Sequence, residues 1–195
     1  MLLIGGWTAA AARQPDGFDP VSQTISALAA RGATDRWLMT AALGAVGISY
    51  AVTALGLRDA ALPGRVVLGC GGLATVGVAA FPLSESGESV AHTVAASIAF
   101  VSVAAWPSVA GRRGPGVPAG LRRPVTRVAA TVLLGLVGWF AVELNGPRTG
   151  LAERVAAGAQ ALWPLAVVLT ARGSDRIGAA DHDESLVRWG RLRWR

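Results

Sequence analysis

Five long apolar runs restrict what this chain can fold into more than any other feature of its sequence. Each run approaches or reaches the roughly 20 residues that an α-helix needs to cross the hydrocarbon core of a bilayer. Charged residues, glycine or proline separate each run from the next. The sequence therefore predicts an all-α integral membrane helix bundle, with spans at Trp37–Leu57, Gly64–Leu83, Val90–Ala110, Val125–Leu144 and Leu151–Ala171.

The opening run, Met1–Ala12, is apolar but has only about half the length of a span at 1.5 Å of rise per residue. It lacks the basic start of a signal peptide, and Ala9–Ala12 is a weak cleavage site. We expect a first span whose upstream half is missing, which puts the start position in doubt. The prediction is a bundle of about six transmembrane helices, the first one short, over residues 1–172, and a basic cytoplasmic tail over 173–195.

The composition agrees with lipid as the solvent and excludes several kinds of chemistry. Only 15% of the residues are charged and 52% are hydrophobic, whereas a soluble domain carries about a quarter charged residues. The chain has no lysine, so a lysine Schiff base is excluded. Cys70 is the single cysteine, and His92 and His182 fall on opposite sides of the predicted topology. We therefore expect no disulfide within the chain, no haem held by two histidines and no other cofactor.

The arginines indicate the orientation in the membrane. With the N-terminus inside, the cytoplasmic segments carry more arginines than the opposite side, which fits the positive-inside rule. We expect a multi-pass protein of the cell membrane with both termini cytoplasmic. The net charge of +6 then reflects loops that face anionic lipid, and no nucleic-acid partner is expected. The cytoplasmic arginines are Arg58, Arg65, Arg112, Arg113, Arg122, Arg123, Arg127, Arg172, Arg176, Arg188, Arg191, Arg193 and Arg195, against Arg13, Arg31, Arg36, Arg148 and Arg154 outside.

Small residues recur within the spans. Because helices in lipid associate through close backbone contact, we interpret these residues as packing positions, and Gly/Ala-rich faces as potential contacts in an oligomer or complex. No phosphate-binding glycine loop is present. At the other end of the chain, Ser185–Arg195 interleaves tryptophan with arginine, which fits either a segment lying on the inner headgroups or a disordered basic tail. The small residues are Gly69, Gly71, Gly72, Gly77, Ala91, Ala95 and Ala99.

The first outer loop predicts a short amphipathic helix. Asp19 suits its N-cap, Pro20 its first position and Gly32 its C-terminal cap. Its apolar face would consist of Val21, Ile25 and Leu28, and its polar face of Ser22, Gln23 and Ser26.

Polar residues from all three outer loops belong to one face of the membrane. Charged groups at membrane depth usually face a partner or a cavity. Loop carboxylates are more often solvated, and Glu153 with Arg154 also suits a helix start. Asp19 is explained by capping alone. The set comprises Asp19, Glu85, Glu88, His92, Glu143, Glu153, Arg154 and Gln160, with Glu153, Ala157, Gln160 and Pro164 on one face of the last span.

His92 and Glu143 are the candidate acid and base, because both lie near the outer ends of apolar spans. A structural ion pair or hydrogen bond explains them equally well, and Arg148 and Arg154 are the available cations for Glu143. One histidine with scattered carboxylates does not indicate a metal site. The candidate ligand-binding residues are Arg154, Gln160, Ser22, Ser26 and Glu85.

Several short motifs occur in an order that resembles the domain of unknown function 998 family. They are the stretch from Phe18 to Gly32 followed by Trp37-Leu-Met, then Phe81-Pro with His92 a few residues later, and Gly150-Leu-Ala-Glu-Arg154. The resemblance covers roughly residues 18–172. It implies a six-helix membrane protein, common in actinobacteria, with no settled activity, and a loose fold-level likeness to Frag1/DRAM-type proteins that points to lipids. The short first span departs from this pattern.

Three functions compete. The first expectation is a protein that binds a lipid or other hydrophobic small molecule in an outward-facing pocket between helices. The second is an intramembrane acid/base enzyme acting on a terpenoid or lipid substrate. The third is an accessory subunit of a membrane complex. A transporter has less support, since no inverted repeat or pair of broken helices is visible.

Overall fold

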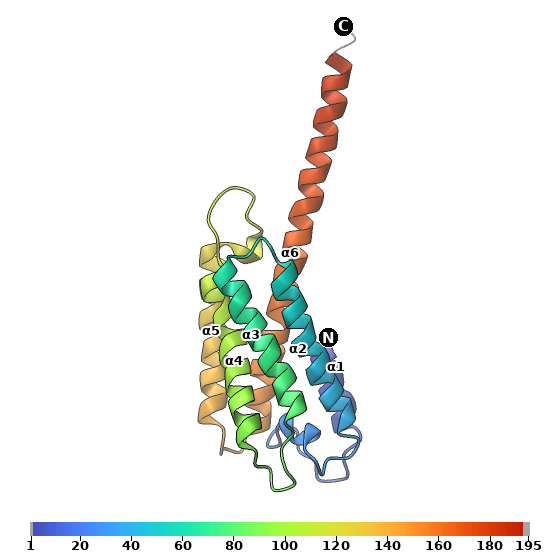
Figure 1. The fold of residues 1–195 in the computed structure, drawn as a ribbon, viewed down its shortest axis with the longest axis vertical. Helices are drawn as coiled ribbons and strands as arrows, with labels where there is room; N and C mark the ends of the chain where they lie inside the picture. Colours follow the sequence, from blue (N-terminus) through green and yellow to red (C-terminus); the bar gives the residue numbers. More distant parts are fainter. Residues whose placement is uncertain (1, 193–195) are drawn as a thin grey trace.

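The computed structural model describes the backbone of residues 2–192 and the side chains of residues 2–173. Over this range the chain is all-helical. Each helix reverses the direction of the one before it (Figure 1). The elements are α1 (Leu2–Ala11), η1 (Ser26–Ala29), α2 (Trp37–Gly56), α3 (Leu62–Ala80), α4 (Val90–Ala110), η2 (Ala119–Leu121), α5 (Arg123–Val142) and α6 (Thr149–Leu192), where η marks a short 3-10 helix.

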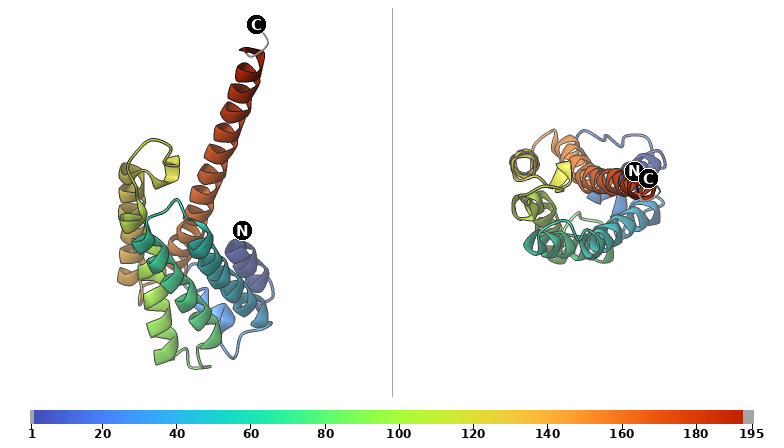
Figure 2. Two further views of the ribbon diagram at one scale, coloured as in Figure 1. Left: turned by 45° about the horizontal axis from the view of Figure 1, so that its top comes forward. Right: turned by 90° about the horizontal axis from the view of Figure 1, so that it is seen from above.

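The connecting loops gather at two ends of the bundle. The η1 end carries the loops 12–36, 81–89 and 143–148, and the η2 end carries the loops 57–61 and 111–122. Seen from above, α1 to α5 follow one another around the bundle and α6 closes it between α5 and α1 (Figure 2). Helix α6 continues beyond the η2 end (Figure 1).

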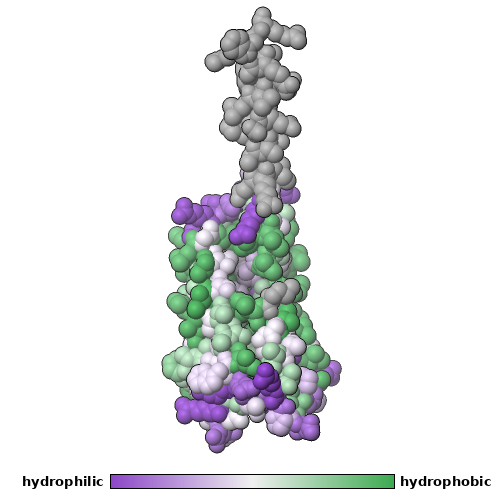
Figure 3. Space-filling view, turned by 90° about the vertical axis from the view of Figure 1, so that its right-hand side faces the viewer, coloured by the Kyte–Doolittle hydropathy of each residue, from purple (hydrophilic) through white to green (hydrophobic). Residues whose placement is uncertain are grey.

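The outer surface of the bundle is apolar. Large aliphatic side chains are exposed on several helices, for example Val52 (61% exposed), Leu73 (68%) and Val128 (66%). Figure 3 shows a hydrophobic band between two hydrophilic ends. Five helices are long and apolar enough to cross a membrane, whereas α1 is shorter. The predicted membrane helix bundle with a short first helix is therefore confirmed.

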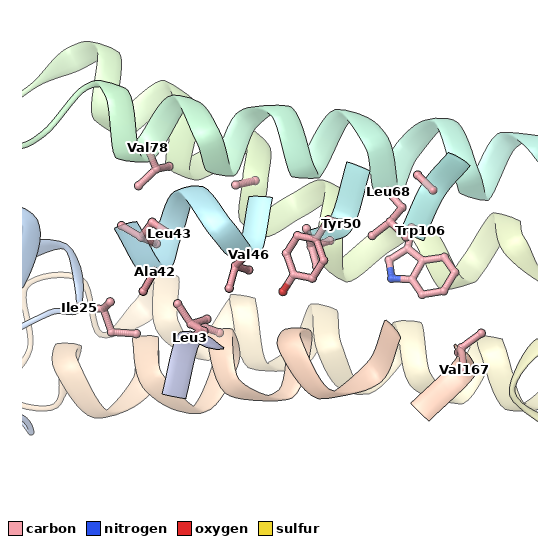
Figure 4. Close-up of a cluster of buried hydrophobic side chains, with 14 of the residues drawn as sticks. Leu3, Ile25, Ala42, Leu43, Val46, Tyr50, Leu68, Val78, Trp106 and Val167 are labelled. Atoms are coloured by element: carbon pink, nitrogen blue, oxygen red, sulfur yellow. The ribbon is translucent and has the colours of Figure 1, made fainter. Parts of the chain in front are cut away.

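Close helix contacts use the glycines that the sequence marked as packing positions. A Cβ atom on Gly72 would lie 2.7 Å from the carbonyl oxygen of Gly47, so α2 and α3 approach at backbone distance here. A Cβ atom on Gly71 would lie 2.7 Å from the Cγ2 atom of Val103 on α4, so α3 and α4 are also in close contact. Apolar side chains fill the interior between these helices and α6, among them Val46, Tyr50, Leu68, Trp106 and Val167 (Figure 4).

The first loop of the η1 end differs in detail from the predicted amphipathic helix. Its helical part is one 3-10 turn, Ser26–Ala29. The N–H of Ala27, at the start of this turn, donates to the Thr24 hydroxyl (3.0 Å). Asp19 closes a turn by accepting from Val21 N (2.9 Å) instead of capping an α-helix. The reason is tertiary, because α6 binds backbone carbonyls that a regular helix would use internally. The two interpretations of Ser185–Arg195, a segment on the inner headgroups or a disordered basic tail, concern side chains that lie outside the described residues.

Candidate functional site

The first turn of α6 holds the loop 18–26 against the bundle. Leu151 N donates to Val21 O (2.9 Å), and Arg154 Nη1 donates to the carbonyls of Pro20 and Gln23 (2.7 Å each). A Cβ atom on Gly150 would collide with the Gln23 carbonyl, so only glycine permits this approach. The start of α6 and the first loop therefore form one unit.

Glu153 is the buried acidic residue of this unit. It is 3% exposed and lies one turn into α6. One carboxylate oxygen accepts from the backbone N–H of Ile25, and the other accepts from the Ser26 hydroxyl (3.2 Å). A buried carboxylate is costly unless it is hydrogen-bonded, and the loop supplies these hydrogen bonds. The loop thus fixes the position of a carboxylate inside an apolar bundle.

Ser26 also contacts His92, which is 4% exposed at the start of α4. The Nε2 atom of His92 lies 3.1 Å from the Ser26 hydroxyl oxygen, and Nδ1 lies 2.9 Å from the Phe81 carbonyl oxygen. The Ser89 hydroxyl caps α4 by accepting from His92 N (3.3 Å). Glu153, Ser26, His92 and Phe81 therefore form one continuous series of hydrogen bonds, contributed by α6, η1, α4 and the end of α3.

The partners restrict where protons lie in this series. A carbonyl oxygen only accepts, so Nδ1 of His92 carries a proton. Two arrangements then satisfy every contact with the same number of protons. In one, Ser26 donates to a Glu153 carboxylate and accepts from an imidazolium. In the other, a protonated Glu153 donates to Ser26, which donates to neutral His92. The geometry permits a proton to pass between Glu153 and His92 through the Ser26 hydroxyl.

A cavity of about 60 Å³ lies beside Glu153 in the bundle interior. Its walls are mostly apolar, with a few polar groups facing it. Gln160, two turns below Glu153 on α6, donates to the Phe100 carbonyl (2.9 Å) and is 4% exposed. No hydrogen bond joins the Tyr50 hydroxyl to any described residue. The polar residues lining the cavity are Ser26, Tyr50, Thr75, Glu153 and Gln160.

The cavity adjoins a wider groove. This groove, of about 250 Å³, lies between α1, α2 and α6 and shares Leu3, Val46 and Tyr50 with the cavity wall. Pro164, which the sequence places on the same face of α6 as Glu153, lines the groove. Figure 4 shows Tyr50 projecting from α2 into the interior between these helices.

The structure divides the candidate site residues into two groups. Ser26 joins Glu153 to His92, and Gln160 shares the cavity wall with Glu153. Arg154, the next residue after Glu153, binds the first loop. The second group lies at the same end of the bundle but away from the cavity: Glu143, whose carboxylate is 3.8 Å from Arg148, Ser22, whose hydroxyl donates to Asp19 (2.7 Å), and Glu85, which is exposed in its loop. Glu143 does not take part in the His92 series, and the cation nearest to it is Arg148 rather than Arg154.

Sequence reasoning placed Glu153 in the outer polar set but attributed it to a helix start and did not select it as a candidate site residue. Glu153 and Arg154 follow Gly150 at a helix start, where acidic residues commonly serve the helix dipole. The signal that identifies Glu153 is its spacing from Gln160, seven residues later on the same face. Tyr50 carried no such signal, since no charged residue lies in its own helix.

The Asp19 carboxylate is held by hydrogen bonds within the first loop. The Ser22 hydroxyl, followed by the Val21 N–H, lowers the pKa of the Asp19 carboxyl below its usual value. Arg154, whose guanidinium lies 5.9 Å from the Phe18 ring centroid, adds a smaller effect of the same sign. Among residues 2–173 no three His, Cys, Asp or Glu side chains gather as a metal site would require.

An all-helical bundle with an apolar outer surface and a polar cluster at one end defines a multi-pass helical membrane protein. The sequence pattern of the family described as "Protein of unknown function (DUF998)" matches residues 1–170, and the chain belongs to that family. No curated protein and no solved structure matches the chain. The motifs that suggested this family, around Phe18–Ser26, at Phe81 and His92, and at Gly150–Arg154, are the segments that meet around Glu153.

Proposed function

We propose that this protein binds a hydrophobic small molecule, such as a lipid, by its polar end in the cavity beside Glu153. The observation that carries the proposal is a buried carboxylate at the wall of an apolar interhelical cavity. Ionisable residues inside membrane bundles are expensive and usually face a partner or a pathway. Structural hydrogen bonds account for the Glu153 oxygens, but they do not account for the cavity with Tyr50 and Gln160 on its walls.

The two adjoining spaces suit a ligand with two chemically different parts. The cavity of about 60 Å³ holds a small polar group, for which Glu153, Gln160 and Tyr50 offer hydrogen bonds. The groove of about 250 Å³ has mainly apolar walls, including Leu3, Val46 and Leu165, and suits an apolar chain. A ligand of this kind would extend from the cavity between α2 and α6.

The proposal takes the η1 end, and with it the pocket, to face the non-cytoplasmic side, because the arginine distribution favours a cytoplasmic η2 end. The start of α1 and the end of α6 both point toward the η2 end (Figure 1). Alkaline phosphatase fused at Gly114 or after Arg195 is then expected to be inactive, because the enzyme folds only outside the cytoplasm. An active fusion at either position contradicts the orientation.

Copurification tests the binding proposal. Native mass spectrometry of the detergent-purified protein is expected to show a retained lipid-like molecule from the expressing cells, and Glu153→Gln is expected to reduce its retention about tenfold, as for the loss of one charged hydrogen bond. Glu143→Gln is the matched control, because it makes the same chemical change at the same end of the bundle outside the cavity. Equal retention by wild type and both variants contradicts a ligand held through Glu153.

An acid/base enzyme is the second candidate, and the Ser26 bridge is the observation that favours it. General acid–base catalysis needs a group that gains and loses a proton at the substrate, and the series ending at Glu153 provides an internal route for that proton. Here Glu153, which lines the cavity, replaces Glu143 as the partner of His92.

Solvent isotope incorporation separates the enzyme from the binding protein. The purified protein is incubated in D₂O with a lipid extract of the expressing cells, and the extract is examined by mass spectrometry. The enzyme proposal predicts that the protein incorporates deuterium into a lipid of the extract or forms a new product. Ser26→Ala should abolish this change, and Ser22→Ala should not. Identical spectra with and without protein contradict catalysis, and the copurification experiment then tests ligand binding by itself.

A further inference from the structure

A second cluster of charged residues lies at the η2 end, far along the bundle from Glu153. Five arginines surround a hollow of about 380 Å³ between the loop 111–122 and the start of α5. All five are exposed. We call this hollow the arginine pocket; its arginines are Arg112, Arg113, Arg122, Arg123 and Arg127.

The fold holds these arginines together. Arg112 and Arg122 form an isolated backbone bridge, in which Arg112 N donates to Leu121 O (2.9 Å) and Arg123 N donates to Arg112 O (3.3 Å). Gly120 N donates to the Thr170 hydroxyl (3.3 Å), which attaches the loop to α6. Gly114 and Gly116 adopt positive φ angles of 124° and 77°, which turn the loop back over the hollow. The pocket is therefore built by backbone contacts and does not depend on flexible side chains alone.

The charges in the pocket are not balanced within the described part of the chain. The ion pairs among residues 2–173 involve Arg13 and Arg148, both at the η1 end, and none of the five pocket arginines. Like charges held close together repel each other, so the arrangement costs free energy unless an anion occupies it. The planar guanidinium group fits the oxygens of a phosphate through paired hydrogen bonds. Phosphate chemistry therefore matches the pocket.

The surface beside the pocket favours a lipid as the source of that phosphate. Arg127 lies one turn into α5, and Leu134, two turns further along the same face of the helix, is an exposed apolar side chain. A phosphate at the arginines would place an acyl chain along this face of α5, against Leu134. We propose that the arginine pocket binds the phosphate group of an anionic phospholipid, independently of the Glu153 cavity.

Lipid titration tests this site. The purified protein in neutral detergent is titrated with phosphatidylglycerol and with zwitterionic phosphatidylcholine, and bound lipid is counted by native mass spectrometry. We expect the protein to bind phosphatidylglycerol in preference to phosphatidylcholine. The double variant Arg122→Gln/Arg127→Gln should reduce this binding roughly tenfold or more, because each arginine near an anionic lipid contributes about 1 kcal/mol. The matched control Arg31→Gln/Arg36→Gln removes the same charge at the η1 end and should leave this binding unchanged.

Three results would overturn the proposal. Equal loss in both double variants would show a general charge effect without a site. Equal binding of both lipids would show no recognition of the anionic lipid. Displacement of phosphatidylglycerol by inorganic phosphate at the same concentration would identify a site for free phosphate instead of lipid. Thermal unfolding of each variant accompanies the titration, and Arg122→Lys/Arg127→Lys, which keeps the charge, should bind more lipid than the glutamine variant.

Discussion

The Nε2 atom of His92 lies 3.1 Å from the hydroxyl oxygen of Ser26, although 66 positions separate the two residues in the chain. This contact joins α4 to the first loop, and the Ser26–Glu153 hydrogen bond (3.2 Å) continues it to α6. One small hydroxyl thus connects the two buried titratable side chains of the η1 end. The stability of this end and its chemistry depend on the same residue.

Removing the Ser26 hydroxyl should destabilise the bundle. Ser26→Ala deprives both Glu153 and His92 of a partner, and we expect a loss of about 1 kcal/mol in the free energy of unfolding, the usual size for an interhelical hydrogen bond in a membrane protein. Thermal unfolding in detergent measures it. Ser22→Ala in the same loop is the control, because the exposed Ser22 hydroxyl contacts only Asp19. A loss as large in the control would show that the loop as a whole, and not the bridge, determines the effect.

Gly150→Ala should separate the first loop from α6. The added methyl group would collide with the Gln23 carbonyl, and accommodating it should cost about 1–3 kcal/mol, as overpacking does in other cores. We expect faster proteolysis within residues 13–24 and a lower unfolding temperature. Gly135→Ala serves as the control, since nothing lies within 4 Å of its added Cβ. An unchanged cleavage rate in Gly150→Ala would contradict the close approach.

Glu143 and Arg154 should contribute independently to stability. Arg154→Gln removes a cation that binds the carbonyls of Pro20 and Gln23, whereas Glu143→Gln breaks only a loose pair with the exposed Arg148. We expect the first change to cost about 1.5–3 kcal/mol, as hydrogen bonds to charged groups do. The second should cost less than about 1 kcal/mol, because Arg148 is largely exposed and its Nε lies 3.8 Å from the Glu143 carboxylate. In a double-mutant cycle the two costs should add, and a coupling energy above about 1 kcal/mol would show that the residues interact directly.

Asp19 should titrate below the usual range of an aspartate. The Ser22 hydroxyl and the Val21 N–H hydrogen-bond to the carboxylate form and lower its pKa in the folded protein. The resulting stabilisation of the loop is present above the ordinary aspartate pKa and is lost as the pH falls through the lowered value. Carboxyl ¹³C NMR of the detergent-solubilised protein measures the titration. Ser22→Ala should bring the Asp19 pKa back toward its usual value, and an unaltered titration in this variant would contradict the assigned cause.

The membrane architecture was predictable because apolar length alone determines it. The five long spans, the short first helix and the gathering of the polar loops at one end all follow from hydropathy and alternation of direction. The choice between Glu143 and Glu153 was not predictable in the same way. Glu143 follows an apolar run, but α5 ends at Val142, so its carboxylate is available to Arg148 at the bundle end.

Glu153 is buried only because the first loop folds over α6. That contact depends on Gly150 and on backbone carbonyls more than a hundred residues earlier in the chain, which periodicity within one helix does not report. The same contact explains the short 3-10 turn in place of the predicted amphipathic helix. Local propensity at Asp19 and Pro20 favoured a helix start, but α6 takes the carbonyls of Pro20 and Val21 for its own hydrogen bonds.

The most direct measurement for the binding proposal is a thermal shift on a variant whose cavity is filled. Ala157 is 8% exposed and lines the cavity, so Ala157→Leu occupies the space of about 60 Å³ without adding a polar group. A lipid extract of the expressing cells should raise the unfolding temperature of the delipidated wild-type protein and of the control Ala141→Leu, whose position on α5 is exposed. The proposal predicts that Ala157→Leu folds but shows no such shift. A shift in Ala157→Leu equal to that of the wild type would contradict ligand binding in the cavity.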